Sequence, residues 1–237
     1  MRAAALSLAL ALGGTAQAQA QEDTCRLALL LALDVSASVD TEEYALQQSG
    51  LISALLHPDV QRAFLDGPGP VALSVFEWSG RFQQEVLVDW TMIHTEADLL
   101  TAVEGIARGT RGSTDFPTAI GYAIGFASAR FAEAPPCLFQ TLDISGDGQN
   151  NDGFPPSAAY LHFPLQGVTV NGLAIGGAQR EIALYYETEI IRGPGSFVEY
   201  ARNHGDFAEV MRRKLERELR AMILGEAGAA DTPPTAP

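Results

Sequence analysis

The feature that most constrains the fold of this chain is an unbroken apolar run near its N-terminus, Leu27 to Leu33. Apolar residues without polar alternation are typical of a strand that is buried on both faces, as in a parallel sheet covered by helices on both sides. The polar cluster Asp34-Val35-Ser36-Ala37-Ser38 follows this run directly. We therefore expect one carboxylate and two hydroxyls at the point where a central strand leaves the sheet.

The rest of the chain alternates between apolar runs and segments with helix-start signals. Further strands are predicted at 71–78, 82–88, 138–144, 167–175 and 197–200. Helices are predicted at 40–56, 95–108, 117–132, 180–191 and 206–223, with a short proline-initiated helix after the polar loop at 149–153. The alternation predicts a three-layer, doubly wound (Rossmann-like) α/β fold. Its mostly parallel six-stranded sheet has one antiparallel edge strand, from the hairpin at Ser79-Gly80.

The N-terminus has the pattern of a secretory signal peptide: one positive charge at Arg2, an apolar stretch, and small residues up to Ala20. We expect cleavage after Ala18 or Ala20, and hence an exported bacterial protein, either secreted or periplasmic. The C-terminus is rich in Ala, Gly, Pro and Thr and has few large apolar groups. The expected organisation is a signal peptide at 1–20, one domain at 21–224 and a disordered tail at 225–237.

The charge of the chain argues against several classes of partner. The formal net charge is −14, which disfavours binding to nucleic acid or to an anionic membrane surface. Lys214 is the single lysine among fifteen basic residues, so no phosphate-binding Walker loop is present. We expect a protein that does not insert into membranes and is a monomer.

Two cysteines, Cys25 and Cys137, are present. In an exported protein a disulfide is the expected state of such a pair. Cys25 lies nine residues before Asp34, and Cys137 lies ten before Asp147. If the strands that end near these aspartates are parallel neighbours, the two thiols come within bridging reach. The alternative is two unrelated buried thiols.

Polar residues that follow separate strands converge at one edge of the predicted sheet. Asp34, Ser36 and Ser38 come after the first strand, Thr114 lies in the loop before the helix at 117–132, and Asp147 follows the strand at 138–144. Ligand sites in open parallel sheets gather at the carboxyl ends of the strands. Two carboxylates and three hydroxyls are the all-oxygen set that a hard divalent cation such as Mg²⁺ prefers.

At these residues the chain resembles the von Willebrand factor type A (VWA) domain and its metal-ion-dependent adhesion site (MIDAS). The family's Asp-x-Ser-x-Ser matches residues 34–38, its Gly-Gly-Thr loop is similar to Gly112-Ser113-Thr114, and its Thr-Asp-Gly is similar to Gly146-Asp147-Gly148. The resemblance covers about residues 25–222, and it is strongest to a branch of exported bacterial proteins with little more than this domain. Ser113 and Gly146 depart from the pattern, because the family has Gly and Thr there.

The resemblance implies roles for the five candidate metal ligands. Ser36, Ser38 and Thr114 would bind a divalent cation, Mg²⁺ or else Mn²⁺ or Ca²⁺, through their hydroxyls, and Asp34 and Asp147 would act directly or through water. An acidic side chain of a protein or peptide partner would take the open coordination position. The resemblance also implies that the last helix shifts along the sheet when a ligand binds.

Other interpretations of single residues stay open. Ser38 and Thr114 also suit helix caps, and Asp147-Gly148 also suits a turn. Asp143 is a rival for Asp147, although its place within an apolar strand favours a buried, hydrogen-bonded carboxylate. Trp78 and Arg81 lie at the predicted hairpin tip and are candidates for the ligand-binding face, with packing as the alternative for Trp78.

The first alternative function is a metal-dependent hydrolase or phosphatase with Asp34 as the nucleophile. Such a phosphatase needs a second carboxylate two residues later, where this chain has Ser36, and a phosphate-binding lysine, whereas Lys214 lies far along the last helix. A Gly-x-Ser-x-Gly elbow and paired zinc-binding histidines are also missing from the sequence. We therefore expect a protein that is not an enzyme.

Two further alternatives are binding or scaffold functions. The segment Asp147–Gly153 has some features of a calcium-binding loop, but Ala158 stands where an EF-hand needs its bidentate Glu. The last alternative is a VWA scaffold with a non-functional metal site. The favoured hypothesis is a metal-dependent protein-binding module.

Overall fold

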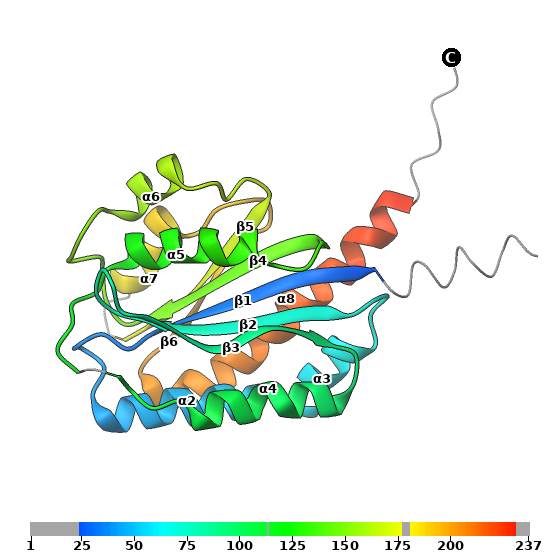
Figure 1. Cartoon of the computed structure of the whole chain (residues 1–237), viewed down its shortest axis with the longest axis horizontal. Coiled ribbons are helices and arrows are strands. Elements are labelled where there is room, and N and C mark those ends of the chain that lie inside the picture. Colours follow the sequence, from blue (N-terminus) through cyan, green and yellow to red (C-terminus); the bar gives the residue numbers. More distant parts are fainter. Residues whose placement is uncertain (1–23, 113, 177–180, 231–237) are drawn as a thin grey trace, which may run out of the picture.

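A computed structural model describes residues 24–112, 114–176 and 181–230 of the chain (Figure 1). They contain a six-stranded sheet in the order β3-β2-β1-β4-β5-β6. Neighbouring strands are parallel except for the edge pair β2 and β3, which is antiparallel. The strands are β1 (Cys25–Asp34), β2 (Val71–Trp78), β3 (Gln84–Ile93), β4 (Cys137–Gly146), β5 (Val168–Ile175) and β6 (Val198–Ala201). The predicted fold class is confirmed, whereas the predicted signal peptide lies outside the described residues.

Helices cover both faces of the sheet, which gives three layers (Figure 1). They are α2 (Thr41–Leu55), α3 (Pro58–Leu65), α4 (Glu96–Arg108), α5 (Ile120–Ala132), α6 (Pro156–His162), α7 (Glu181–Tyr185) and α8 (Phe207–Ala230). A π-helix at Tyr186–Ile190 continues α7, and a 3₁₀ turn at His204–Asp206 precedes α8. The layer formed by α2, α3, α4 and α8 packs on one face, and α5, α6 and α7 pack on the other. Among the described helices, none combines the length and apolarity that a membrane crossing requires.

The apolar run that opened the sequence is explained by the position of β1 at the centre of the sheet. Every residue of β1 is buried. Leu27, Leu29, Leu31 and Leu33 point into the core under α2 and α8, while the alternate residues Ala28, Leu30 and Ala32 point into the core under α5. Because each fully buried leucine contributes about 1.5–3 kcal/mol, β1 is a main source of stability for both layers.

Two helices have boundaries that differ from the prediction. Pro58 was expected only to stop the preceding helix, but it occupies the first turn of α3, where His57 caps the N-terminus and the missing proline N–H is not needed. Helix α5 begins at Ile120, three residues after Pro117. The backbone of the segment before it is engaged elsewhere: the Phe116 carbonyl accepts from Ala37 N at 2.8 Å.

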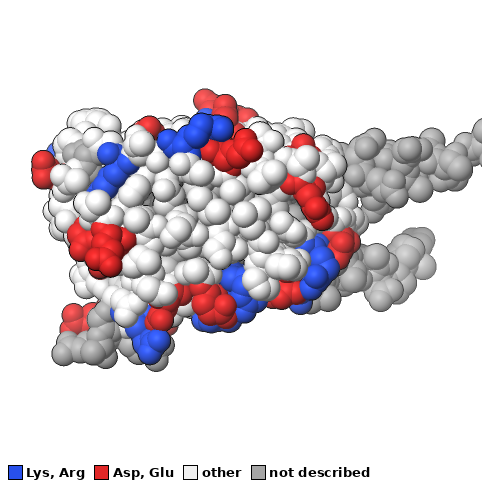
Figure 2. Space-filling model, turned by 90° about the horizontal axis from the view of Figure 1, so that it is seen from below, with Lys and Arg blue, Asp and Glu red and all other residues white. Residues whose placement is uncertain are grey.

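The last helix also runs further than predicted. Helix α8 continues to Ala230, past the boundary expected at residue 224 and into the segment expected to be a disordered tail, of which residues 231–237 are not described. Figure 2 views the molecule from the side of α2, α3 and α4. Charged side chains of both signs lie mainly along the margins of this face, and uncharged side chains fill most of the area between them.

The predicted disulfide is present. Cys25 and Cys137 are directly paired in the register of β1 and β4, with their Cα atoms 4.5 Å apart, and their sulfur atoms are bonded. The bond lies at the amino end of both strands. The polar cluster that follows β1 therefore lies at the opposite edge of the same two strands.

Candidate metal centre

Three loops meet at the carboxyl edge of the sheet. The loop after β1 is held by backbone hydrogen bonds from Val35 N to the Trp78 carbonyl, at 2.9 Å, and from Ala37 N to the Phe116 carbonyl. The segment before α5 is joined to the loop after β4, because Asn151 N donates to the Thr118 carbonyl at 2.9 Å. These bonds fix the backbone on which the polar side chains of the three loops are carried.

The structure brings Asp34, Ser36, Ser38 and Asp147 into one hydrogen-bonded cluster. The Ser36 amide donates to Asp34 Oδ1 at 2.8 Å. The hydroxyls of Ser36 and Ser38 lie 3.1 Å apart, and the Ser38 hydroxyl donates to Asp147 Oδ1 at 2.6 Å. Four of the five predicted ligands thus lie together, although they come from two strands far apart in sequence.

The threonine of the cluster is Thr118 and not Thr114. Thr118 is buried, and its hydroxyl donates to the Ser36 hydroxyl at 3.2 Å. Thr114 is exposed, and its hydroxyl bonds to Asp115 Oδ1 at 3.3 Å. The difference follows from the non-helical segment before α5, which carries Thr118 to the site. The Gly-Ser-Thr motif directed the prediction to Thr114, whereas Thr118 was placed inside the helix predicted at 117–132 and was not considered as a ligand.

The environment of Asp34 disfavours an isolated negative charge. Burial, reinforced by the nearby Asp147 carboxylate, raises the pKa of Asp34 to about 7, while hydrogen bonds from Ser36 and from the Asp147 backbone oppose the shift. Asp34 Oδ2 is buried without a hydrogen-bond partner among the described residues. A buried, unsatisfied carboxylate oxygen beside a second carboxylate is what a bound cation would stabilise. The donor set therefore fits a hard divalent ion, with Asp34, Ser36, Ser38, Thr118 and Asp147 as the candidate ligands.

Tyr186 is a further group at this site that the sequence did not indicate. Its ring is fully buried, and its hydroxyl has no hydrogen-bond partner among the described residues. A Cβ placed on Gly146 would lie 2.7 Å from Tyr186 Oη and 2.8 Å from Asp34 Oδ2. The glycine that replaces the family's threonine thus leaves the space in which the phenol and the carboxylate approach each other. Burial and the nearby Asp34 hold the pKa of the Tyr186 phenol well above its usual value.

The two residues proposed for the ligand-binding face have different positions. Trp78 is fully buried in the core under α5, so it does not belong to that face, and packing is the correct interpretation. Arg81 is exposed, and its guanidinium pairs with Asp152, with Nη2 to Oδ1 at 2.7 Å. This ion pair connects the β2–β3 turn with the loop after β4 at the rim of the site.

Two other groups of ionisable side chains lie outside this centre. Asp143, the rival for Asp147, forms a buried ion pair with Lys214 and is not part of the cluster. His57, Asp59 and Glu216 have ligand atoms within 4.8 Å of one another. Because Arg62 pairs with Asp59 and Arg212 pairs with Glu216, the carboxylates of that group are already neutralised and we assign no metal to it.

Comparisons with known proteins agree with this fold. A family model described as "Protein of unknown function (DUF1194)" matches residues 24–223. A search of curated proteins gave no match. Among solved structures, a von Willebrand factor type A protein from Catenulispora acidiphila is similar with a TM-score of 0.60 at 15% identity, over 83% of this chain and 43% of that one.

Another similar structure is proximal thread matrix protein 1 from the mussel byssus, with a zinc-occupied MIDAS motif. Its TM-score is 0.58 at 15% identity, over 84% of this chain and 48% of that one. The conserved hypothetical protein BatB from Bacteroides thetaiotaomicron has a TM-score of 0.50 at 15% identity, over 83% of this chain and 98% of that one. The chain thus spans less than half the length of the first two. At these identities the likeness establishes the fold, which is that of a VWA domain.

Proposed function

We propose that this chain, which belongs to the DUF1194 family and has a VWA fold, is a metal-dependent recognition module that binds an acidic group of a protein or peptide partner. The observation that carries the proposal is the cluster of two carboxylates and three hydroxyls at the carboxyl edge of the sheet. A zinc-occupied MIDAS motif in a protein of the same fold supports it.

The chemistry of the cluster suits this task. Two carboxylates, Asp34 and Asp147, balance the charge of a divalent cation formally, and the hydroxyls are neutral ligands that leave the ion electrophilic. An acidic side chain of a partner is then a favourable additional ligand, so an acidic protein can hold an acidic partner through the metal. Mg²⁺ is the proposed ion, with Mn²⁺ and Ca²⁺ as alternatives of the same ligand preference.

A non-enzymatic role is part of the proposal. Asp34, the nucleophile of the hydrolase alternative, is fully buried, and Ser36 stands where such a phosphatase needs its second carboxylate. The Ser38 hydroxyl is hydrogen-bonded to a carboxylate of the same cluster and not to a histidine that would act as a base. These observations favour binding over catalysis.

Export to an oxidising compartment is proposed on the basis of the disulfide between Cys25 and Cys137 and the N-terminal sequence pattern. Disulfides persist in the bacterial periplasm and outside the cell and are rare in the cytosol. N-terminal sequencing of the protein recovered from a periplasmic fraction tests this proposal. Cleavage after Ala18 or Ala20 supports it, and an intact N-terminus in the cytosolic fraction contradicts it.

The metal proposal is tested by calorimetric titration with Mg²⁺ and Mn²⁺ of the wild type and of two valine variants. Thr118→Val removes a hydroxyl from the cluster without changing side-chain volume much, and we expect a loss of at least about tenfold in metal affinity. Thr114→Val is the matched control, because its hydroxyl bonds only to Asp115 among the described residues. Equal metal affinity in all three proteins would contradict the assignment of Thr118 as a metal ligand.

A further inference from the structure

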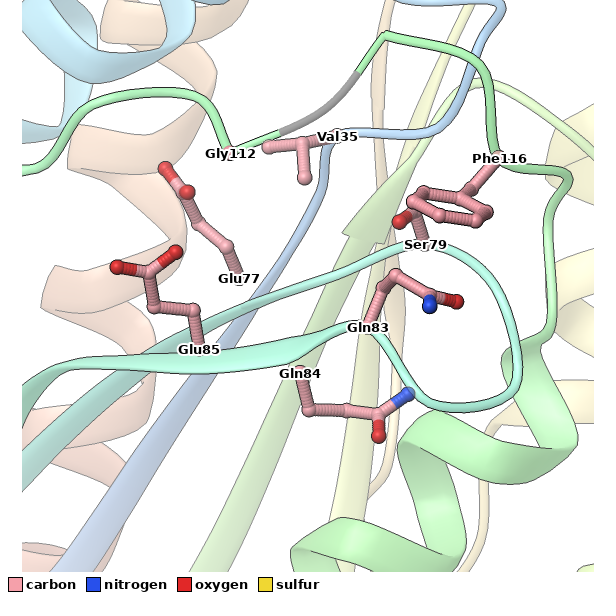
Figure 3. A pocket seen from close by; sticks show the side chains of 8 residues that line it. All are labelled: Val35, Glu77, Ser79, Gln83, Gln84, Glu85, Gly112 and Phe116. Carbon is pink, nitrogen blue, oxygen red and sulfur yellow. The ribbon is translucent and has the colours of Figure 1, made fainter.

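A cavity of about 210 Å³ lies beside the candidate metal centre, between the ends of β2 and β3 and the loop before α5 (Figure 3). Val35, which stands between two of the candidate metal ligands, forms part of its wall. Phe116 contributes an aromatic ring, and polar side chains from the β2–β3 hairpin complete the lining, namely Ser79, Gln83 and Gln84. The cavity adjoins the metal centre at Val35, but none of the candidate metal ligands lines it.

Two glutamates line the same end of this cavity. Glu77 and Glu85 are directly paired in the register of β2 and β3, and their side chains lie side by side below Gly112 (Figure 3). Glu85 is exposed, whereas Glu77 is only 3% exposed. Like charges directly opposite each other in an antiparallel pair are destabilising, so this pairing needs compensation.

The compensation is incomplete within the part of the chain that the structure describes. The Glu77 carboxylate forms no ion pair there, and the neighbouring group that lies close to it is the neutral hydroxyl of Tyr44. The guanidinium of Arg111 is nearby, but its Nη2 donates to the carbonyls of Ser36, at 2.9 Å, and Val35. A buried carboxylate thus faces a cavity with a second carboxylate and without a cation bonded to it.

The ionisation of Glu77 is consistent with this geometry. Burial raises the pKa of the Glu77 carboxyl to about 7, and the Glu85 carboxylate adds to the increase, while Tyr44 and Arg111 oppose it. A positively charged group in the cavity would favour the ionised form, and it would relieve the repulsion between the two glutamates.

The remaining lining indicates an organic cation. The ring of Phe116 and the side chain of Val35 offer apolar walls to an aliphatic stem, and Phe116 lies at the end of the cavity away from the two glutamates (Figure 3). Charge-assisted hydrogen bonds to two carboxylates favour a guanidinium in particular, because it donates in two parallel directions.

We propose that this cavity binds an ammonium or guanidinium group at the end of an aliphatic chain, as in a lysine or arginine side chain, through Glu77 and Glu85. A role in partner binding rests on the proposed function. In that case the cavity would bind a basic side chain of the partner, while the metal binds an acidic one. The preferred partner would then carry both charges close together on one surface.

The test is a titration of the full chain with n-butylguanidinium, followed by amide NMR shifts, with uncharged n-butylurea as the matched ligand control. We expect saturable binding of n-butylguanidinium alone, with the largest shifts at residues that line the cavity. Glu77→Gln should weaken it about tenfold, and Glu104→Gln, an exposed change on α4, should leave it unchanged. Equal binding to the wild type and Glu77→Gln, or equal binding of n-butylurea, would overturn the proposal.

The same titration is repeated with EDTA, which separates the cavity from the metal centre. We expect n-butylguanidinium to bind in EDTA as well, because the glutamates do not depend on the metal. If n-butylguanidinium binds while Mg²⁺ has no affinity for the protein, the proposed metal-dependent function is wrong and the proposal for the cavity is supported. If Glu77→Gln abolishes a Mg²⁺ response and leaves n-butylguanidinium binding intact, the cavity is a metal site and the proposal is wrong.

Discussion

Gly146 is one of the two residues at which this chain departs from the VWA pattern, and its missing side chain has a structural reason. Tyr186 Oη and Asp34 Oδ2 both lie within 3 Å of the position that a Cβ would occupy. Gly172 on the neighbouring strand makes room for the same tyrosine ring, with Tyr186 Cδ1 2.6 Å from the equivalent point. The two glycines therefore allow one buried aromatic residue to close the side of the cluster.

Gly146→Ala is expected to destabilise the protein by about 1–3 kcal/mol, because the added methyl group overlaps the phenol and the carboxylate in a packed region. Urea denaturation measures this change. Gly148→Ala is the matched control, since its Cβ would lie 3.4 Å from Thr118 Oγ1, an ordinary contact. A gain of stability in Gly146→Ala, as expected for an unhindered glycine replacement, would contradict the packing described here.

The raised pKa of Glu77 predicts that the stability of the protein depends on pH. In the unfolded chain its carboxyl ionises near pH 4.5, whereas in the folded chain the pKa is about 7. Below pH 4.5 both states are protonated and the group has no effect. Between these values the unfolded state releases the proton first, so folding loses stability as the pH rises, by up to about 3 kcal/mol above pH 7.

Glu77→Gln removes this titration, so the variant should be more stable than the wild type at pH 8 and of similar stability at pH 4. Urea denaturation at both pH values measures the difference, with Glu104→Gln as the exposed control. The same free-energy difference between variant and wild type at pH 4 and pH 8 would show that the carboxyl does not titrate as described.

The residues of the candidate site differ in how far the sequence could predict them. Asp34, Ser36 and Asp147 follow apolar strands, so the direction of each strand places them at one edge of the sheet. Thr118 was missed because the signals for a helix start at Pro117 placed it inside a helix, whereas α5 begins only at Ile120. Tyr186 lies far along the chain, and its position near Asp34 depends on packing between two layers, for which a single sequence carries no pattern.

At the scale of elements, α8 is attached to the sheet by a buried network of charges. Lys214 Nζ lies 2.6 Å from Asp143 Oδ2 of β4 and 2.6 Å from Glu218 Oε1 of its own helix. Asn171 of β5 donates to Glu218 Oε1 at 2.7 Å. Burial lowers the pKa of the Lys214 amine, but the two carboxylates more than reverse the change, so the lysine stays charged. A shift of α8 along the sheet, as the VWA resemblance implies, would have to break or rearrange these contacts.

Lys214→Met is therefore expected to destabilise the protein by about 3–5 kcal/mol, because it leaves Asp143 and Glu218 buried without their cation. Thermal and urea denaturation measure the loss. Arg213→Met, at the neighbouring and half-exposed position, should change stability by less than about 1 kcal/mol. Adding Asp143→Asn and Glu218→Gln to Lys214→Met should recover part of the loss. A loss as small as that of Arg213→Met would contradict the anchoring role.

The elements also show why most of the fold was predictable. The strands were predicted from apolar runs, because a central strand such as β1 needs apolar residues on both faces. Helix starts were found where a capping box is present, as with Asp40 before α2 and Glu43 in its first turn. Helix α3 was missed because Pro58 was interpreted as a stop, although proline is also favoured in a first helical turn. The π-helix that carries Tyr186 has no such local signal.

At the scale of the whole molecule, the disulfide and the candidate metal centre occupy opposite ends of the same two central strands. The bond joins residues 112 positions apart, so it closes a long loop and restricts the unfolded chain strongly. On the chain-entropy model a loop of about 100 residues corresponds to about 4–5 kcal/mol of stability. The register between β1 and β4 is continuous from Leu27 to Leu33, and those contacts hold the strands without the bond.

The last prediction follows from this separation. Replacing Cys25 and Cys137 by alanine should lower the free energy of unfolding by about 2–5 kcal/mol. It should leave the affinity for Mg²⁺ within about twofold of the wild type under conditions where both proteins are folded, since independent sites far apart have nearly additive effects. Urea denaturation and calorimetric titration measure the two quantities, with reduced wild type as the control. A loss of metal affinity in the folded double variant would show that the disulfide also positions the carboxyl edge. Equal stability of oxidised and reduced wild type would show that the sheet register alone holds the two strands.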